Sequence, residues 1–255
     1  MTATGLFDVT DRVVVVTGAG SGIGRGIALG LGALGAQVFG MDRDPGGLAE
    51  TAALAEGQRF QPIACDVAVE AGVDAAFAGV MAQAGRLDVV FANAGIAGHP
   101  LDIDSLDLAE WRRVHSINLD GSFLTMRAAA RIMKPQGSGK IIVTASTWGV
   151  RGTRVAPFTA YAASKGALVN LTRQMALELA LTGVTVNAIA PGGFATNMAN
   201  GVLDQAAADL LLSQMPMAKF VTPAAMVGPA VFLASAASDY VTGILLPVDG
   251  GYLAQ

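Results

Sequence analysis

The sequence predicts an α/β fold in which a parallel sheet carries helices on both of its faces. Short runs of β-branched residues, such as residues 13–16, are apolar at every position, which is typical of strands buried on both faces of a sheet. Segments with an apolar residue at every third or fourth position separate these runs and predict helices. The alternation β-α-β-α-β-α-β in the first part of the chain requires parallel strands joined by crossover helices.

The first predicted strand, residues 13–16, leads into a glycine-rich turn that reads T-G-A-G-S-G-I-G over residues 17–24. A helix is expected from about Gly22, since apolar residues recur with helical spacing from Ile23 to Leu34. The free N–H groups and partial positive charge of a helix start suit a pyrophosphate, and glycine allows close approach to the backbone. A plain glycine-rich turn is the structural alternative. The residues expected to bind a dinucleotide here are Gly18, Ser21, Gly22, Ile23 and Gly24.

The second predicted strand covers residues 37–41 and ends at Asp42. Asp42 lies close to the roughly 20-residue offset from the glycine-rich turn at which an acidic residue meets the adenosine ribose. A carboxylate there accepts hydrogen bonds from a free ribose and repels a 2′-phosphate. Two unit charges about 4 Å apart are worth about 4 kcal/mol at an effective dielectric near 20. NAD is therefore expected in preference to NADP, the alternatives being a solvated Asp42 and a phosphate accepted by Arg43.

The next elements complete the first half of the sheet. Residues 45–56 and 69–84 are expected to be helices, and residues 59–65 and 87–91 strands. Asp66 and Val67 follow the third strand at its carboxyl end, where an adenine edge is expected. Asn93-Ala94-Gly95 follows the fourth strand, where small residues let the chain pass beneath a cofactor ribose and Asn93 can pin the turn through backbone hydrogen bonds.

The following helix is expected to begin at Asp107, which forms with Glu110 the pattern of a capping box, and to continue to about Met133. Asn118 lies inside this helix, where an amide side chain competes with the backbone for hydrogen bonds. Asn118 is therefore either a tolerated polar residue or a residue that binds something.

A further strand, residues 140–145, runs into Ser146, and a long helix over residues 158–181 carries Tyr161 and Lys165 in its first turns. The i, i+4 spacing places both side chains on one helix face. A lysine ammonium beside a phenol favours the phenolate and lowers the tyrosine pKa from its usual value near 10. The pair is thus expected to transfer protons near neutral pH, the alternative being an exposed Tyr and Lys of no special role.

The last part of the chain contains two more expected strands, residues 185–190 and 244–248. Thr222 and Pro223 are expected to start a helix as its N-cap and first residue. Between the strands, residues 194–220 hold an excess of apolar side chains that are expected to cover a substrate. They are Met198, Leu203, Leu210, Leu211, Met215 and Met217.

Taken in order, the motifs of the whole chain resemble those of the short-chain dehydrogenase/reductase family. The similarity runs from about Arg12 to Asp249-Gly250-Gly251 and implies a Rossmann-type, doubly wound, seven-stranded parallel sheet. It also implies a single domain, residues 1–255, with a substrate-covering segment at about residues 192–220. The motifs are Thr17-Gly18-x-x-x-Gly22-x-Gly24, Asn93-Ala94-Gly95, Asn118, Ser146, Tyr161-x-x-x-Lys165 and Pro191-Gly192-Gly193 with Thr196.

The resemblance implies an NAD-dependent enzyme that interconverts a secondary alcohol and a ketone. It implies that Tyr161 transfers the hydroxyl proton, that Lys165 lowers the pKa of Tyr161 and holds the nicotinamide ribose, and that Ser146 positions the substrate oxygen. Asn118 would support a water-linked proton path. Pro191, Gly192 and Thr196 would join the cofactor contacts.

Two departures from the family pattern concern the second half of the site. The residues beside Ser146 are Ala145 and Thr147, where a second serine is usual, so Thr144 and Thr147 are alternative hydroxyls. The gap between Ser146 and Tyr161 is slightly long, and the extra residues 151–157 are expected to reshape the rim of the pocket.

The substrate cannot be named from the sequence, although a mainly apolar pocket is expected. Arg151 and Arg154 would either meet an anionic group or be solvated. The alternative enzyme is an NADPH-dependent 3-oxoacyl carrier-protein reductase, which Asp42 and the lack of a basic patch disfavour. A catalytically idle dinucleotide-binding or scaffold protein is the alternative of another class. The candidate pocket residues are Ile96, Trp148, Phe158, Phe194, Met198 and Met215.

Composition limits the partners. Apolar residues make up 53% of the chain and charged residues only 14%, so part of the apolar surface is expected to be buried in a homo-oligomer, and the family resemblance suggests a tetramer. A net charge of −4 gives no electrostatic footprint for nucleic acid or an anionic membrane. One cysteine and two histidines exclude an intramolecular disulfide and a His/Cys zinc site. The lack of a basic and apolar leader favours a cytoplasmic location.

Overall fold

The sheet is the first feature of the computed structural model, which describes residues 3–196, 198 and 204–255. Its seven strands are parallel, in the order β3-β2-β1-β4-β5-β6-β7. The expected doubly wound sheet is therefore confirmed. The strands are β1 Val13–Thr17, β2 Gln37–Asp42, β3 Phe60–Ala64, β4 Val89–Ala92, β5 Gly139–Thr144, β6 Val184–Pro191 and β7 Leu245–Val248.

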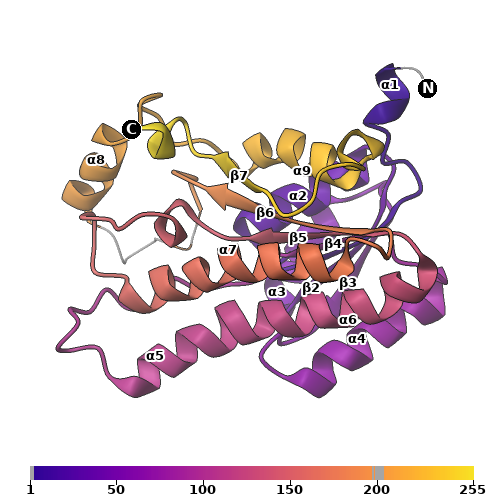
Figure 1. Ribbon diagram of the computed structural model, residues 1–255, viewed down its shortest axis with the longest axis horizontal. Helices are drawn as coiled ribbons and strands as arrows, with labels where there is room; N and C mark the ends of the chain where they lie inside the picture. The colour runs from indigo at the N-terminus through magenta and orange to yellow at the C-terminus, as the bar shows by residue number, and fades with distance from the viewer. Residues whose placement is uncertain (1–2, 197, 199–203) are drawn as a thin grey trace.

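Helices cover both faces of the sheet, with α4, α6 and α7 in one layer and α2 and α9 in the other (Figure 1). Strand β1 serves both layers, since Val13 and Val15 belong to the core beneath α4, α6 and α7, whereas Val14 and Val16 belong to the core beneath α2 and α9. This alternation explains why the strand is apolar throughout. The helices are α1 Ala3–Leu6, α2 Gly22–Ala33, α3 Pro45–Leu54, α4 Glu70–Ala84, α5 Leu108–His115, α6 Gly121–Gln136, α7 Thr159–Leu179, α8 Gln205–Ser213 and α9 Val227–Ala234.

The strand order reverses at β1, which pairs with β2 on one side and β4 on the other. The connections from β1 and β4 therefore leave in opposite directions, and a crevice opens at the carboxyl ends of these strands. Ligands of doubly wound sheets bind at such switch points.

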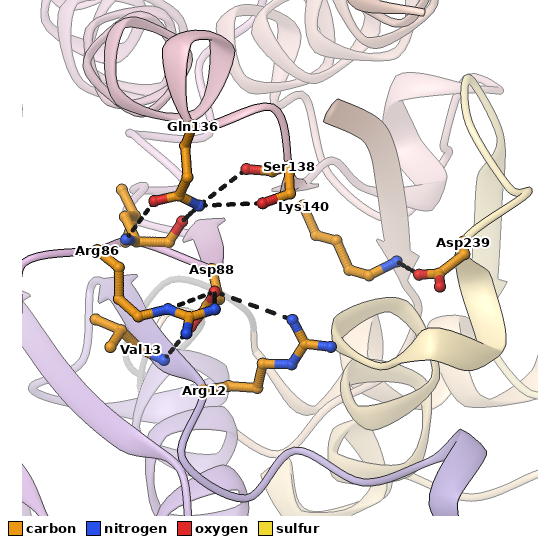
Figure 2. A network of polar contacts seen from close by, with 9 residues as sticks. Arg12, Val13, Arg86, Asp88, Gln136, Ser138, Lys140 and Asp239 are labelled. Carbon is orange, nitrogen blue, oxygen red and sulfur yellow. Dashed lines mark hydrogen bonds and ion pairs between the residues drawn. The ribbon is translucent and has the colours of Figure 1, made fainter. Parts of the chain in front are cut away.

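The opposite, amino-terminal edge of the sheet is fixed by polar contacts (Figure 2). Asp88 is buried and accepts hydrogen bonds from the backbone N–H of Val13 at 2.8 Å and from Arg86 Nε at 3.0 Å. Lys140 is also buried, and its Nζ lies 2.8 Å from a carboxylate oxygen of Asp239. At the edge away from the crevice, β1 is thus held to the segment before β4, and β5 to the segment after α9.

Two helix starts differ from expectation. Asp107 caps α5 by accepting a hydrogen bond from the N–H of Glu110 at 2.8 Å, but the Glu110 carboxylate bonds the N–H of His99 instead of returning to Asp107. Half of the capping box is therefore present. Thr222 precedes a 3₁₀ turn, Pro223–Met226, that leads into α9, and its side chain makes no capping hydrogen bond.

The helix expected over residues 107–133 is interrupted by a π-helical turn, Ser116–Asp120, between α5 and α6. The expected substrate-covering segment contains α8, but residues 197 and 199–203, among them Leu203, lie outside the described residues. Within the part of the chain that the structure describes, no helix is both long enough and apolar enough to span a lipid bilayer.

Candidate active site

A cavity of about 760 Å³ opens at the carboxyl ends of the strands. Its walls come from the turns after β1, β2, β3, β4, β5 and β6, from α7 and from α8. Nearly all of the predicted site residues line it. They are Gly18, Ser21, Gly22, Ile23, Asp42, Asp66, Val67, Asn93, Ala94, Gly95, Ser146, Tyr161, Lys165, Pro191, Gly192 and Thr196.

The glycine-rich turn brings the start of α2 to one end of this cavity. Gly18 has a positive φ of 70°, and a Cβ there would lie 3.0 Å from the Cα of Ala94. The side chain of Ser21, the N-cap of α2, makes no hydrogen bond to the helix, so the first N–H groups of α2 have no side-chain cap. The helix start therefore suits an anion approaching from the cavity.

Gly24 does not line the cavity, unlike the other predicted glycines. A Cβ on Gly24 would lie 2.1 Å from the carbonyl oxygen of Gly18 and 2.6 Å from Nδ2 of Asn93. Gly24 is required because α2 packs directly on the turn, and the structure gives it no contact with the cavity.

Asn93 joins the ends of three strands. Its Nδ2 donates to the carbonyl oxygen of Thr17 at 3.0 Å, and its Oδ1 accepts from Oγ1 of Thr144 at 3.0 Å. The predicted pinning of this turn by Asn93 is confirmed, and it fixes the cavity floor between β1, β4 and β5.

Asp42 is tied to the glycine-rich turn. Its two carboxylate oxygens accept hydrogen bonds from the N–H of Gly20 at 2.9 Å and from the N–H of Asp44 at 3.0 Å. A Cβ on Gly20 would lie 2.8 Å from Asp42 Oδ2, so a larger residue there would displace the carboxylate. Asp42 and Arg43 both line the cavity, so a negative and a positive group lie at the same end.

Ser146, Tyr161 and Lys165 meet at the other end of the cavity. The turn Thr147–Gly149 packs on the backbone of α7, where a Cβ on Gly149 would lie 2.5 Å from the carbonyl carbon of Lys165. This contact places Ser146, at the end of β5, beside α7. Lys165 donates through Nζ to the carbonyl oxygen of Thr144 at 2.6 Å, and Nζ lies 5.8 Å from the centre of the Tyr161 ring.

Burial is the main cause of the pKa shifts of Tyr161 and Lys165. Burial raises the pKa of Tyr161 above its usual value, which a hydrogen bond with the Ser146 hydroxyl partly opposes. Burial also lowers the pKa of Lys165 to about 8. The expected lowering of the Tyr161 pKa by Lys165 is therefore wrong for the protein by itself, because removing water from a buried phenol favours its neutral form.

Asn118 is buried in the π-helical turn and does not line the cavity. Its Oδ1 accepts from the N–H of Ile96 at 2.8 Å, and its Nδ2 donates to the carbonyl oxygen of Ile96 at 2.9 Å and to Oγ of Ser164 at 3.1 Å. The side chain thus fixes the loop that follows Gly95. Its predicted part in a proton path stays a prediction.

The apolar candidates largely meet at the catalytic end. Ile96, Trp148, Phe158, Phe194 and Met198 line the cavity. Met215 does not, because it is buried against Gly193, where a Cβ would lie 2.6 Å from its sulfur. Sequence reasoning missed Arg113, Phe220 and Tyr252, and Tyr252 comes from a C-terminal turn with no local signal.

The loop of residues 151–157 does not itself line the cavity, and its expected effect on the pocket rim stays a prediction. Arg151 instead donates to the backbone carbonyl oxygens of Tyr252 and Gln255, both at 3.3 Å, and its guanidinium lies 5.1 Å from the centre of the Tyr252 ring. Neither Arg151 nor Arg154 faces the cavity.

A helix start, a carboxylate after β2 and a buried Tyr-Lys pair around one cavity define a doubly wound α/β protein of the dinucleotide-binding class. Comparison with known proteins narrows this class. A family model described as "Enoyl-(Acyl carrier protein) reductase" matches residues 18–253. The chain belongs to the short-chain dehydrogenase/reductase family, which makes it an oxidoreductase that uses a nicotinamide dinucleotide.

Three similar proteins illustrate the range of this family. Levodione reductase of Leifsonia aquatica is 37% identical over 253 residues, covering 95% of this chain and 94% of that protein. Cis-4-hydroxycyclohexanecarboxylate dehydrogenase of Sinomonas cyclohexanicum is 39% identical over 245 residues, covering 96% and 97%. The crystal structure of a gluconate 5-dehydrogenase from Burkholderia cenocepacia J2315, in complex with NADP and tartrate, superposes with a TM-score of 0.93 at 35% identity and full coverage of both chains.

Proposed function

We propose that the chain is an NAD-dependent dehydrogenase that interconverts a secondary alcohol and a ketone, with Tyr161 as the acid–base residue. The observation that carries the proposal is the meeting of Tyr161, Lys165 and Ser146 at one end of the cavity, while the start of α2 lies at the other end. An extended dinucleotide fits this arrangement. The activities named for its relatives support the reaction class.

The residues of the cavity suit a dinucleotide along its whole length. The first N–H groups of α2 would hold the pyrophosphate, and Gly18 leaves no side chain between the phosphates and the backbone. Asp42 would accept hydrogen bonds from the adenosine ribose, and Lys165 would donate to the nicotinamide ribose. The bound cofactor supplies the hydride chemistry, and the protein supplies positioning and electrostatics.

In alcohol oxidation, Tyr161 as phenolate accepts the hydroxyl proton of the substrate, and in ketone reduction its phenol returns that proton. Ser146 holds the reacting oxygen within reach of Tyr161. Lys165, fixed by the Thr144 carbonyl, stays on the side of the cavity where it can hold a ribose hydroxyl. We propose that residues 192–220 cover the substrate and exclude water, and α8 supports this because Ala208 and Leu211 line the cavity.

The preference for NAD rests on Asp42. Its carboxylate is held at the turn by two backbone N–H groups, so it cannot swing away from a 2′-phosphate without losing both hydrogen bonds. Relatives of known structure include three with NADP, so the family alone does not decide the cofactor. Arg43 lies beside Asp42, but the fixed carboxylate opposes a second negative group there.

The test is Tyr161→Phe, measured on an alcohol found by following NADH absorbance over a set of secondary alcohols. The change removes the hydroxyl and keeps the ring, so turnover should fall by about hundredfold to ten-thousandfold, the range of a lost acid–base group. NADH binding should stay within a few-fold of the unmodified protein. Tyr240→Phe is the matched control, because Tyr240 is fully exposed and lies outside the cavity lining.

A correctly folded Tyr161→Phe protein that turns over within a few-fold of the unmodified protein would refute this mechanism. A protein that binds NADH but oxidises no alcohol and reduces no ketone would instead be the idle dinucleotide-binding protein.

A further inference from the structure

The wall around Tyr161 is made of hydrocarbon and aromatic rings. Trp148 stacks on Phe158, with ring centres 5.5 Å apart and an interplanar angle of 22°, and meets Tyr161 edge to face at 6.1 Å and 87°. Phe158 is itself buried and also lines the cavity, so the two stacked rings form one aromatic surface there. Phe194 and Leu211 line the same cavity from the segment after β6.

The cavity offers few hydrogen-bonding side chains beyond those that the proposed mechanism uses. Tyr252 lines the cavity but is buried, and its hydroxyl lies 3.3 Å from Oε1 of Gln214. Among the described lining residues outside the proposed cofactor and catalytic contacts, this leaves Thr147, His99 and Arg113 as the main polar side chains near the substrate. A hydroxyl buried without a partner costs free energy, so this wall suits few hydroxyls.

The positive charge of Arg113 is already neutralised. Its Nε and Nη2 donate to the two carboxylate oxygens of Glu110 at 2.6 and 2.8 Å. This pairing lowers the pKa of Glu110 to about 2, so the carboxylate stays ionised throughout the neutral range. The imidazole Nδ1 of His99 lies 3.0 Å from Glu110 Oε1 as well. The three groups share the Glu110 carboxylate, which reduces the attraction of Arg113 for the carboxylate of a sugar acid.

We infer that the substrate carries its reacting carbon in or beside an apolar, ring-shaped hydrocarbon skeleton that lies on Trp148, and that polyhydroxy acids are poor substrates. This inference rests on the proposed function and names its substrate class. A saturated ring presents a flat hydrocarbon face to the indole, and burying that face stabilises the complex. The relatives act by their names on both kinds of molecule, so family membership does not make this choice.

The kinetic test compares 4-methylcyclohexanol with D-gluconate, both with NAD. We expect kcat/KM to be at least about a hundredfold higher for the ring alcohol, because the apolar wall favours one and leaves the hydroxyls of the other unpaired. Trp148→Ala should raise KM for 4-methylcyclohexanol by about tenfold or more and change kcat less, as expected for a lost binding face. Phe7→Ala is the control, an exposed aromatic residue outside the cavity lining.

A binding test needs no turnover. The chain has two tryptophans, so Trp111→Phe leaves Trp148 as the sole indole, and Trp111 does not line the cavity. The NADH complex of this variant cannot oxidise an alcohol. Its tryptophan fluorescence should change saturably with 4-methylcyclohexanol and stay unchanged with D-gluconate at the same concentrations. Leu211→Asn, a change on the partly exposed side of α8, should weaken that response if Trp148→Ala does not fold.

The outcomes separate this inference from the proposed function. Any of three results would overturn the inference. They are turnover of D-gluconate that is faster than that of the ring alcohol, an unchanged KM in folded Trp148→Ala or Leu211→Asn, and the lack of a saturable fluorescence response to the ring alcohol. A full response of Trp148 without any turnover would support the inference and refute the proposed function. Turnover of D-gluconate that is faster than that of the ring alcohol, and that Tyr161→Phe abolishes, would overturn the inference and support the proposed function.

Discussion

Asp42 is a single carboxylate with two structural duties, because it both faces the cavity and holds the N–H groups of Gly20 and Asp44. Asp42→Ala would remove the charge and the acceptors together, so any loss of NAD binding would be ambiguous. Asp42→Asn removes the charge and keeps one oxygen acceptor, so only one of the two backbone hydrogen bonds is lost. It is the sharper probe of cofactor choice.

We expect Asp42→Asn to raise kcat/KM for NADP by about tenfold to hundredfold, since the repulsion of a 2′-phosphate disappears while solvent screening limits its size. The kcat/KM for NAD should fall by a smaller factor. Steady-state kinetics with both cofactors measure this, and Asp104→Asn, an exposed carboxylate outside the cavity lining, is the control. A preference of the unmodified protein for NADP would contradict the assignment.

We expect Lys165 to make cofactor affinity depend on pH. Its buried ammonium has a pKa of about 8, so it is present below that pH and lost above it. If Lys165 donates to a ribose hydroxyl, the Kd for NADH should rise as the pH rises through 8, by up to about tenfold per unit. The Lys165→Met variant should bind NADH more weakly than the unmodified protein at pH 6.5, and its Kd should show no rise as the pH passes through 8. Fluorescence titrations with NADH from pH 6 to 9.5 measure both.

The free energy of unfolding should rise over the pH range in which the affinity for NADH falls. The pKa of Lys165 is lower in the folded chain than its unfolded value near 10.4, so between about pH 8 and 10.4 the unfolded chain binds more protons and the free energy of unfolding rises with pH. The raised pKa of Tyr161 opposes this only above about pH 10. Weaker NADH binding above pH 8 without loss of stability would therefore report the lysine and not unfolding. A pH-independent Kd would contradict the ribose contact.

At the scale of elements, the junction of α5 and α6 depends on a contact with a distant loop. Asn118 pairs with both backbone groups of Ile96, so Asn118→Ala leaves an N–H and a carbonyl oxygen without their partner. Each such group costs about 1–3 kcal/mol when buried, and we expect a loss of about 2–4 kcal/mol in the free energy of unfolding. Urea denaturation measures it.

Asn118→Asp is the matched variant, because it keeps the acceptor for the Ile96 N–H and loses the donor to the Ile96 carbonyl oxygen. Its loss should be at least as large as that of Asn118→Ala, because the new carboxylate oxygen is buried and faces the Ile96 carbonyl oxygen. Equal stability of Asn118→Ala and the unmodified protein would show that the π-helical turn does not depend on this amide.

The elements that sequence predicts well are those whose cause is local. Strand β1 is apolar because both of its faces are covered, and its predicted and observed bounds differ by one residue. The π-helical turn could not be predicted in this way, because the partner of Asn118 is a backbone segment 22 residues earlier in the chain. Glu110 likewise leaves its expected capping role because the N–H of His99, brought near by the loop after β4, competes for its carboxylate.

The site follows the same rule. Gly18, Asp42 and Ser146 lie at or just after the ends of strands that the sequence shows, the Tyr161–Lys165 pair lies in the first turns of an expected helix, and all of them line the cavity. Tyr252 reaches the cavity only because the C-terminal turn folds back, held by Asp249, whose carboxylate accepts from the N–H groups of Gly251 and Leu253 at 2.9 Å. The pKa of Tyr161 could not be foreseen either, since it depends on how completely the fold removes water.

At the scale of the whole molecule, stability and chemistry are placed at opposite edges of one sheet. The polar contacts of Asp88 and Lys140 fix the amino-terminal edge (Figure 2), while the cavity lies at the carboxyl edge. A sheet held at one edge can present its other edge as a rigid platform for residues that follow the strands. This arrangement explains why the predicted site residues follow strands that are otherwise apolar.

The outer face of α7 is the surface on which we expect the chain to assemble. Ala163, Ala167, Asn170, Gln174 and Leu177 recur every three or four positions and are all exposed, with 78% of the Leu177 surface accessible. Small residues in such a stripe let two helices approach closely, and a self-complementary stripe suits a two-fold axis. With only 14% charged residues in the chain, this face suits burial in a homotetramer.

Light scattering at micromolar concentration should therefore give a mass near four times the 25.8 kDa of one chain. Ala167→Arg puts a long charged side chain in the middle of the stripe, so the two helices can no longer approach and the mass should fall to that of a dimer or monomer. Ala75→Arg, at an exposed position of α4, should leave the mass unchanged. A monomeric mass for the unmodified protein would contradict assembly altogether, whereas a tetramer that survives Ala167→Arg would place the interface on another face.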